Sequence, residues 1–180
     1  MNLKQEKTKI VEFFKKHLNT EIWYWLGLCP TRIIPLSFFE NELVKKLDWQ
    51  FLCENKTTPT SFFEENLDKV DWVYLSKNTS VPVSYFEKHL DKINWENLCR
   101  NTNIPVSFFE KNLDKINWWR LCENTNIPVT FFETHLDKVS WACLCKNTNI
   151  PVTFFEKHFD KIDWHWLCPN AVYKYTNKFL

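Results

Sequence analysis

The chain has 180 residues, which is enough for one domain with a substantial buried core, and it carries 16 Phe, 10 Trp and 5 Tyr but a single Gly. Its 23 Lys and Arg nearly balance its 22 Asp and Glu, so it lacks the basic excess that favours nucleic acid as a partner. Seven cysteines, an odd number, and an N-terminus without the apolar core of a signal peptide predict free thiols and an intracellular, cytoplasmic location.

The N-terminal part is charged and amphipathic, and we expect residues 1–21 to form a capping helix. Within it and just beyond, Val11–Trp25 carries a degenerate copy of a pattern that recurs later in the chain. The register between Trp23 and Trp49 stays open by one or two residues. The longest apolar run, Ile22–Cys29, is too short to cross a bilayer, and no lipidation signal is present, so we expect no membrane association.

From Trp49 onward a 23-residue unit recurs with the pattern D/N/S-W-x-x-L-C-x-N-T-x-I-P-V-S/T-F-F-E-x-x-L-D-K-I/V. Its tryptophans, expected to be structural, are Trp49, Trp72, Trp95, Trp118, Trp141 and Trp164. The asparagines with the same expected role are Asn78, Asn101, Asn124 and Asn147. A fixed period in this range predicts one repeat domain over residues 1–180, with tandem helix pairs over 22–168, in about six to seven units, and a C-terminal cap over 169–180.

The second half of the unit predicts a helix over residues 107–115. Ser107 and Glu110 form an S-x-x-E capping box, in which the Ser hydroxyl accepts from the Glu N–H and the Glu carboxylate reaches back. Phe109, Leu113 and Ile116 follow at the spacing of one helix face. Because the box recurs in each regular unit, every second helix is expected to begin at its Ser or Thr.

The first half of the unit predicts a shorter helix that begins at each Trp. An Asp, Asn or Ser precedes the Trp and suits the N-cap, as Asn117 does before Trp118. Leu121 and Cys122 continue the face of Trp118, and Asn124 falls where a left-handed residue ends a helix, which accounts for the missing glycines. Two short helices per unit predict an all-α fold, an α-solenoid of 23-residue two-helix repeats.

A leucine-rich-repeat-like solenoid is the alternative, because its unit length includes 23 residues. Such a repeat needs an apolar residue two positions before the Leu, on the same strand face. Three of the six residues there are polar or ionisable, namely Gln50, Glu96 and His165. The capping boxes also have no role in that fold, and these two observations favour the helical solenoid.

The unit W-x-x-L-C/S-x-N, together with FFEKHLDKI, resembles tandem repeats in proteins of large DNA viruses of the mimivirus kind. The resemblance covers roughly residues 45–170 and departs from that family at the near-constant Cys, where Ser is expected. It implies a viral repeat protein, located in the host cytoplasm, and it implies no particular chemistry.

Chemistry-bearing residues recur with the repeat and do not gather at one place. The Cys ladder lacks a C-x-x-C motif, and equivalent residues of stacked helices lie about 8–10 Å apart, too far to share one zinc ion. His89, His135 and His158 share one repeat position with Asn66 and Asn112, which favours polar packing. We therefore expect no enzyme activity, no metal and no cofactor.

The two positions after each Trp vary freely from unit to unit, and we expect stacking to align them into one exposed stripe. The residues expected to bind a partner there are Phe51, Tyr74, Glu96, Asn97, Trp119, Arg120, His165 and Trp166. Trp, Tyr and Arg are the types enriched at interface hot spots. The leading hypothesis is a non-enzymatic protein–protein interaction module or scaffold, in a virus one that engages a host factor. A structural, self-assembling protein with homo-oligomers and a Cys-based metal or redox role are the alternatives.

Overall fold

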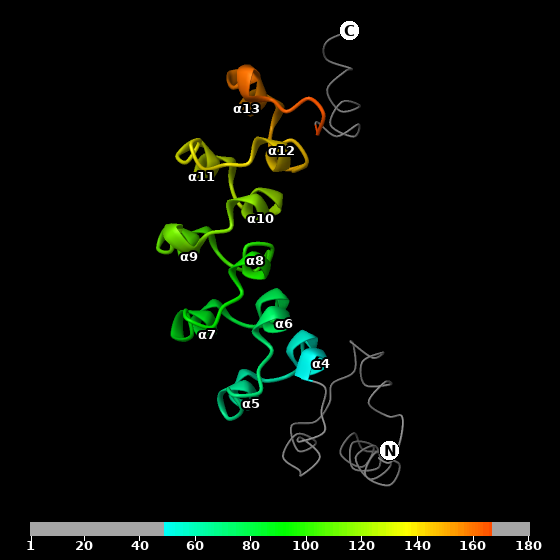
Figure 1. Ribbon diagram of the computed structural model, residues 1–180, viewed down its shortest axis with the longest axis vertical. Coiled ribbons are helices and arrows are strands. Elements are labelled where there is room, and N and C mark those ends of the chain that lie inside the picture. The colour runs from blue at the N-terminus through cyan, green and yellow to red at the C-terminus, as the bar shows by residue number, and fades with distance from the viewer. Residues whose placement is uncertain (1–48, 167–180) are drawn as a thin grey trace, which may run out of the picture. The chain divides into compact units, whose positions relative to one another are not determined.

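Ten short α-helices and two 3₁₀ turns run along residues 49–166, the part of the chain that the computed structural model describes (Figure 1). The expected caps over 1–21 and 169–180, and the degenerate repeats before residue 49, lie outside these residues. The chain divides into two units, residues 1–81 and 82–180, and each is described by itself.

Helices alternate between two kinds, which we call A helices, beginning at each Trp, and B helices, following each Pro. In the first unit these are α4 (Trp49–Glu54), α5 (Thr60–Glu64) and α6 (Trp72–Lys77). In the second unit they are α7 (Val83–Lys88), α8 (Trp95–Leu98), α9 (Val106–Glu110), α10 (Trp118–Glu123), α11 (Val129–Glu133), α12 (Trp141–Leu144) and α13 (Val152–Lys157), with 3₁₀ turns η2 (Leu113–Lys115) and η3 (Phe159–Lys161).

Within the second unit the A helices form one row and the B helices another (Figure 1). In each unit consecutive A helices pack on each other, α4 on α6 and α10 on α12. Residues 49–166 contain no strand. The predicted all-α solenoid of 23-residue two-helix repeats is therefore confirmed, and the leucine-rich alternative is wrong.

The A helices begin as the sequence predicts, at an Asp or Asn whose side chain accepts from backbone N–H groups of the first turn. Asp71 accepts from Val73 N at 3.0 Å, and Asn117 accepts from Arg120 N at 3.1 Å. These bonds satisfy donors that have no partner inside the helix. Ser140 occupies the same position before α12 but makes no such side-chain bond.

The predicted left-handed asparagine is wrong: Asn78 and Asn124, which end α6 and α10, are extended, whereas α8 and α12 have their C-caps two residues earlier, at Cys99 and Cys145. Asn124 has φ −77° and ψ 111°, and no non-glycine residue with positive φ occurs in residues 49–166. Its side chain instead bridges two repeats: Nδ2 donates to the carbonyls of Cys99 at 2.9 Å and Asn101 at 3.3 Å, and Oδ1 accepts from Asn126 N at 2.9 Å. The amide must reach the preceding repeat, and an extended backbone aims it there.

The same bonds recur at equivalent positions. Asn147 donates to the carbonyls of Cys122 at 2.8 Å and Asn124 at 3.3 Å, and in the first unit Asn78 donates to those of Cys53 at 2.7 Å and Asn55 at 3.2 Å. These asparagines are 5% exposed or less. A buried amide with all three bonds made explains why the repeat keeps this residue so strictly.

The B helices are shorter than predicted and begin one residue earlier. Helix α9 spans Val106–Glu110 where the sequence predicts 107–115, and Pro105 is its N-cap without a side-chain bond. A capping box needs an N–H on the N-cap residue to receive the Glu carboxylate, and Pro has none. The predicted capping boxes are therefore wrong: Ser107 and its equivalents are exposed positions inside the first turn.

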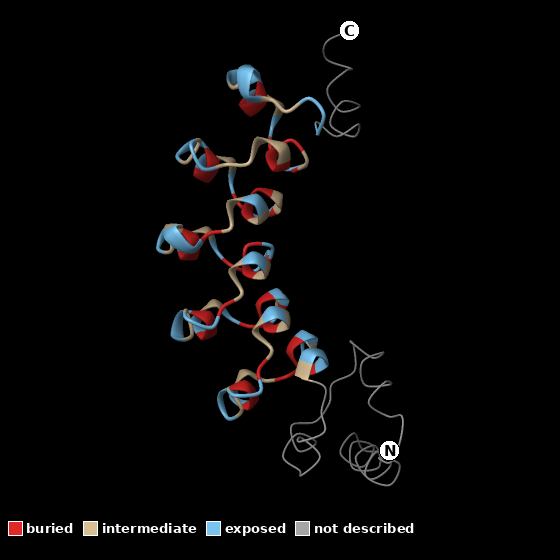
Figure 2. Ribbon diagram, viewed as in Figure 1, coloured by how far each residue is buried: buried red, intermediate tan, exposed pale blue. Residues whose placement is uncertain are grey.

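The core lies between the two rows, and the exposed residues lie on their outer sides (Figure 2). In the second unit the second Phe of each pair and the Leu of each A helix fill it. Phe86, Phe109 and Phe132 are fully buried, as are Leu98, Leu121 and Leu144. One Leu from each A helix and one Phe from each B helix therefore provide a continuous apolar seam from very short helices.

Each described repeat Trp but Trp164 is half-buried, and the Trp rings that stack are covered from two sides. Trp118 stacks on Phe131 with centroids 5.7 Å apart and planes 12° apart, and Lys138 Nζ lies 5.9 Å from the centre of its ring. Trp95 repeats this arrangement with Phe108 and Lys115. Trp164 is 56% exposed. These tryptophans thus join an A helix to the next B helix and are not fully buried core.

The His/Asn position closes the C-terminal end of a B helix. His135 Nδ1 lies 2.8 Å from the Phe131 carbonyl, and Asn112 Nδ2 donates to the Phe108 carbonyl at the same distance. A carbonyl only accepts, so Nδ1 of His135 carries a proton. Both residues present an N–H to the carbonyl four positions earlier, and this shared donor explains why they interchange.

We expect His135→Asn to change the free energy of unfolding by less than about 0.5 kcal/mol and His135→Ala to lower it by about 1 kcal/mol, because only alanine removes the donor. Urea denaturation followed by circular dichroism measures both. Equal losses in the two variants would show that ring stacking, and not the hydrogen bond, selects histidine.

Candidate protein-interaction surface

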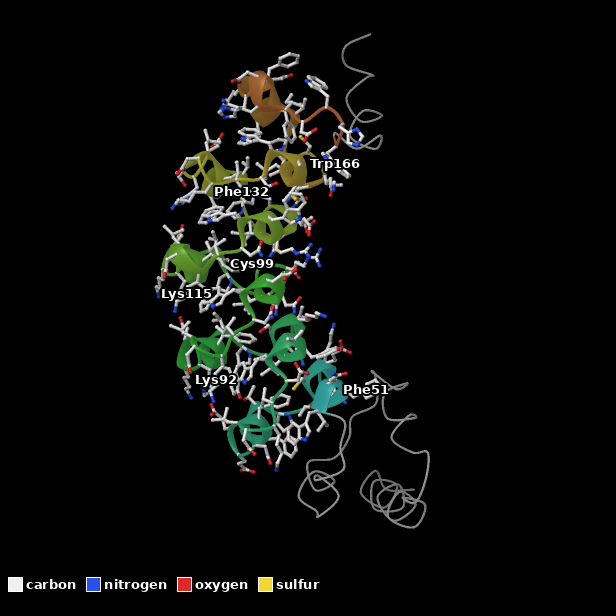
Figure 3. All side chains as sticks on the ribbon, viewed as in Figure 1. Phe51, Lys92, Cys99, Lys115, Phe132 and Trp166 are labelled. Carbon is white, nitrogen blue, oxygen red and sulfur yellow. The ribbon has the colours of Figure 1, made fainter. Side chains whose placement is uncertain are left out.

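The exposed variable residues lie on the side of the A helices that faces away from the B helices, which we call the outer face. In the second unit Trp166 lies on this side, and Lys115 lies on the opposite side, beside the B helices (Figure 3). The first variable position is exposed at Glu96 and Trp119 and half-exposed at Ala142. The second is half-buried at Asn97 and Arg120, and Cys143 is fully buried. In α8, α10 and α12 the two positions therefore differ: the first is the more exposed, and the second packs partly between repeats.

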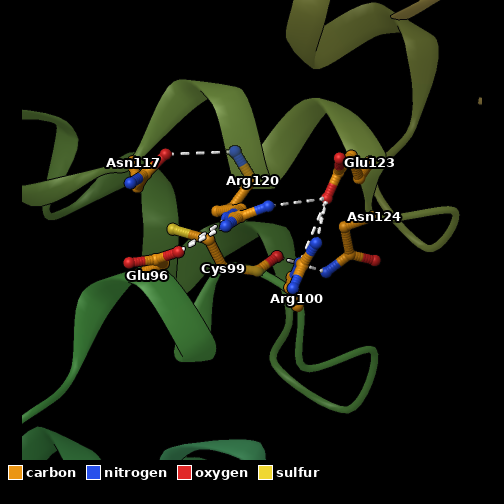
Figure 4. Close-up of polar contacts among 7 residues, drawn as sticks. All are labelled: Glu96, Cys99, Arg100, Asn117, Arg120, Glu123 and Asn124. Carbon is orange, nitrogen blue, oxygen red and sulfur yellow. Dashed lines mark hydrogen bonds and ion pairs between the residues drawn. The ribbon is translucent and has the colours of Figure 1, made fainter. Parts of the chain in front are cut away.

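Arg120 is tied into a network of ion pairs between α8 and α10 (Figure 4). Its guanidinium donates to Glu96 Oε1 from Nε at 2.8 Å and from Nη2 at 2.5 Å, and Nη1 lies 3.6 Å from Glu123 Oε2. The Glu96 carboxylate in particular raises the pKa of the Arg120 guanidinium. Arg120 is thus a poorer candidate anchor for a partner than the sequence predicts, because its donors already have acceptors.

Arg100 completes the network. Its Nε and Nη2 donate to Glu123 Oε2 at 3.0 and 2.7 Å. Arg100 and Glu123 lie four residues after Glu96 and Trp119, so they belong to the same outer face. Sequence reasoning missed this third position, although the change from Glu123 to Lys146 between two otherwise similar repeats was a visible signal.

Trp119 is the most prominent apolar residue on the outer face of the second unit. It is 48% exposed, and among the described residues its ring has no aromatic or hydrogen-bonding partner. The flanking small residues are Ala142, half-exposed, and Cys143, buried. An indole held on a rigid helix beside small side chains is the kind of anchor that interfaces use.

His165 and Trp166, predicted on the last A helix, lie in a turn over residues 164–166. Both are exposed, and Trp166 carries the Lys146 ammonium 3.6 Å from its ring centre. In the first unit Phe51 and Val73 are 44% and 43% exposed, and Tyr74 is half-buried with Lys77 Nζ 5.0 Å from its ring centre. Each unit therefore has exposed apolar side chains on its own outer face.

The Cys ladder lies inside the stack. Burial raises the pKa of Cys99 from 9.0 to about 11 and that of Cys122 to about 12, although backbone N–H groups of the next repeat partly oppose the rise. The Ser140 N–H, for example, donates to Cys122 Sγ at 3.4 Å. Since the thiolate is the nucleophile and the metal ligand, these thiols are poorly suited to either task. Among residues 49–166, no three His, Cys, Asp or Glu side chains gather closely enough to hold a metal ion.

We expect the buried thiols to react with a thiol reagent at pH 8 only when the chain unfolds, because the native thiols keep their protons. The free energy of unfolding should not depend on these groups below about pH 9, and it should fall as the pH rises toward the native pKa of about 11 for Cys99. Labelling with and without denaturant, followed by peptide mapping, tests this. Rapid native labelling of Cys99 or Cys122 would contradict it.

No protein-family model, curated protein or solved structure matches the chain. No helix among residues 49–166 combines the length and the apolar run that a membrane span requires. The class that the fold defines is a helical-repeat protein. Its 23-residue repeats are linked by buried asparagines and carry varied side chains on their outer face.

Proposed function

We propose that this chain is a non-enzymatic protein–protein interaction module that presents the outer face of its A helices to another protein. One observation carries the proposal: Trp119 stands half-exposed on a frame that is otherwise strictly repeated. The frame gives the indole a fixed position at little entropic cost on binding, which is how rigid aromatic anchors contribute affinity. The neighbouring polar groups, Glu96 and Arg100, supply charged contacts around that anchor.

The resemblance to repeats of large DNA viruses supports a more specific form of the proposal, in which the partner is a host protein. Repeat arrays commonly recognise partners through the residues that the stack does not need, since those residues can vary without harm to the fold. Here the frame residues, such as Leu121 and Asn124, are buried, while Trp119 is exposed. The variation between units therefore lies where it can set the choice of partner.

Proximity labelling in cells, with the intact chain and a Trp119→Ala variant, tests the proposal. Because the side chain is about half exposed and lies outside the buried seam, the substitution should leave the fold intact. Labelling of a specific protein should drop at least about tenfold, as loss of an anchor of about 1.4 kcal/mol or more predicts. The matched control is Phe159→Ala, which removes an aromatic ring that is 63% exposed in η3, on the B side of its repeat.

Two results would contradict the proposal. One is an identical set of labelled proteins for the intact chain and Trp119→Ala. The other is an equal loss of labelling in Phe159→Ala, which would indicate non-specific adhesion of exposed aromatic rings. Circular dichroism of each purified variant confirms that the comparison is made between folded proteins.

A further inference from the structure

The outer face of the second unit is a small grid of side chains. Each A helix, together with the turn that follows it, contributes two residues four positions apart, which lie on the same face. Helix α10 contributes Trp119 and Glu123, and the adjacent helix α12 presents Ala142, with Lys146 following directly after its C-cap. Since α10 packs on α12, the four side chains form neighbouring corners of one patch.

The two sides of this patch complement each other. The large Trp119 lies across from the small Ala142, and the acidic Glu123 lies across from the basic Lys146. A face whose two halves are complementary about a midline can pair with a second copy of itself, because a two-fold axis brings each half onto the other half of its partner. The axis that does this lies in the interface, parallel to the A helices and midway between α10 and α12.

On this basis we infer that the partner that the outer face fits is a second copy of this chain, in an antiparallel, two-fold symmetric dimer. Trp119 of each copy then covers Ala142 of the other, and Glu123 of each copy pairs with Lys146 of the other. The inference rests on the proposed function, since it takes the outer face to be the interaction surface, and it names the occupant of that surface.

Charge supports a second copy over an unrelated apolar surface. Glu96, Arg100, Arg120 and Glu123 form a connected set of two acids and two bases. Lys146 stands outside it: no carboxylate of the described residues lies within ion-pair distance of its ammonium, which rests on the Trp166 ring. In the two-fold pair this cation meets Glu123 of the other copy, whose carboxylate has two oxygens to share among its donors.

The next row is compatible with the same axis. The two-fold axis places Glu96, which lies one repeat before Trp119, opposite His165 of the other copy, which lies one repeat after Ala142. An imidazole donates an N–H to a carboxylate in either protonation state, so this pair is also favourable. The two-fold axis thus brings together three pairs of side chains, of which one matches in size, one in charge and one in hydrogen-bonding capacity.

Two charge-reversal variants of the full chain test the inference. Glu123→Lys places two bases together at both symmetric contacts of a homodimer, and Lys146→Glu places two acids together there. We expect the intact chain to dimerise in sedimentation velocity and each variant to be at least tenfold weaker as a dimer. An equimolar mixture of the two variants should recover a heterodimer, because in that pair both contacts join an acid to a base.

Glu123 also bonds Arg100 and Arg120 within its own chain, so its variant needs a second measurement. Thermal unfolding by circular dichroism reports on folding, and the pair Trp119→Ala with Ala142→Trp repeats the mixing experiment on size in place of charge. In that pair each variant forms a poor homodimer, while the mixture sets one Trp on one Ala at both contacts.

Recovery of a heterodimer on mixing either pair establishes the two-fold arrangement. An intact chain that stays monomeric up to high micromolar concentration would overturn it, and the proposed function would still stand if Trp119→Ala abolished labelling of a cellular protein. A dimer that none of the four substitutions weakens would overturn it as well. That dimer would bury another surface, and the outer face would then have to show a cellular partner of its own.

Discussion

Replacing Asn124 with alanine is expected to lower the free energy of unfolding by about 2–4 kcal/mol, a large share of the stability of a short repeat array. The amide is 2% exposed and makes three hydrogen bonds, two of them to carbonyls of the preceding repeat. Alanine leaves the carbonyls of Cys99 and Asn101 buried without this donor. A buried polar group left without its partner costs more than the hydrogen bond itself contributed.

Urea denaturation followed by circular dichroism measures this effect, and Asn126→Ala is the matched control. Asn126 is exposed, and its Nδ2 donates to the Thr102 carbonyl at 2.6 Å, so water can replace the lost bond. We expect the control to lose less than about 1 kcal/mol. Because the lost bonds join two repeats, the Asn124 variant should also unfold over a broader range, as expected when neighbouring units uncouple. Equal losses in the two variants would contradict the role of the buried amide.

The asparagine shows how far the sequence alone leads. Its recurrence after each A helix predicts that it ends the helix, which is confirmed for α6 and α10, whereas α8 and α12 have their C-caps at Cys99 and Cys145, two residues before their asparagines. The conformation was predicted from the local preference of Asn for left-handed backbone, and this prediction is wrong. What decides the backbone at Asn124 is a pair of carbonyls 23 and 25 residues earlier, and no local rule contains that distance.

The start of the B helices was mispredicted for a related reason. The S-x-x-E pattern at Ser107 and Glu110 matches a capping box, and a Pro lies two residues before Ser107. In the structure Pro105 itself is the N-cap. A residue without an N–H removes one of the two bonds that define the box, and this is visible in the sequence once Pro is considered as the cap.

The variable positions were predicted as one exposed stripe, which holds for both members of the first and last pairs, whereas in α8, α10 and α12 the second member is half-buried or buried. An alignment of the 23-residue repeats compares only equivalent positions. Arg120 contacts Glu96, which lies 24 residues earlier and therefore at a different repeat position. Comparing each second position with the first position of the preceding repeat would have paired Arg120 with Glu96 and Cys143 with Trp119. These pairs match an acid with a base and a large residue with a small one.

This offset pairing changes the interpretation of the two positions that vary from repeat to repeat. If the second position compensates the first position of its neighbour, part of the variation serves packing between repeats and only the remainder is free for a partner. Trp119 is half-exposed even though Cys143, its counterpart, is fully buried. Packing alone does not need a ring of that size at the surface, and this excess is the reason to seek the interface there.

Replacing Phe132 with alanine is expected to lower the free energy of unfolding by about 3–5 kcal/mol, because the ring is fully buried at the seam between the two rows of helices. Trp118→Ala, which the period alone predicts to be equally severe, should cost less, about 1.5–3 kcal/mol, since the indole is half-buried and loses contacts mainly with Phe131 and Lys138.

Urea denaturation of both variants, followed by circular dichroism, gives the comparison. The order of the two losses matters more than their size. If Trp118→Ala proved the more damaging, the Trp ladder and not the Phe seam would hold the A and B helices together. The exposed part of the repeat tryptophans would then be a by-product of their packing role, and it would not indicate where a partner binds.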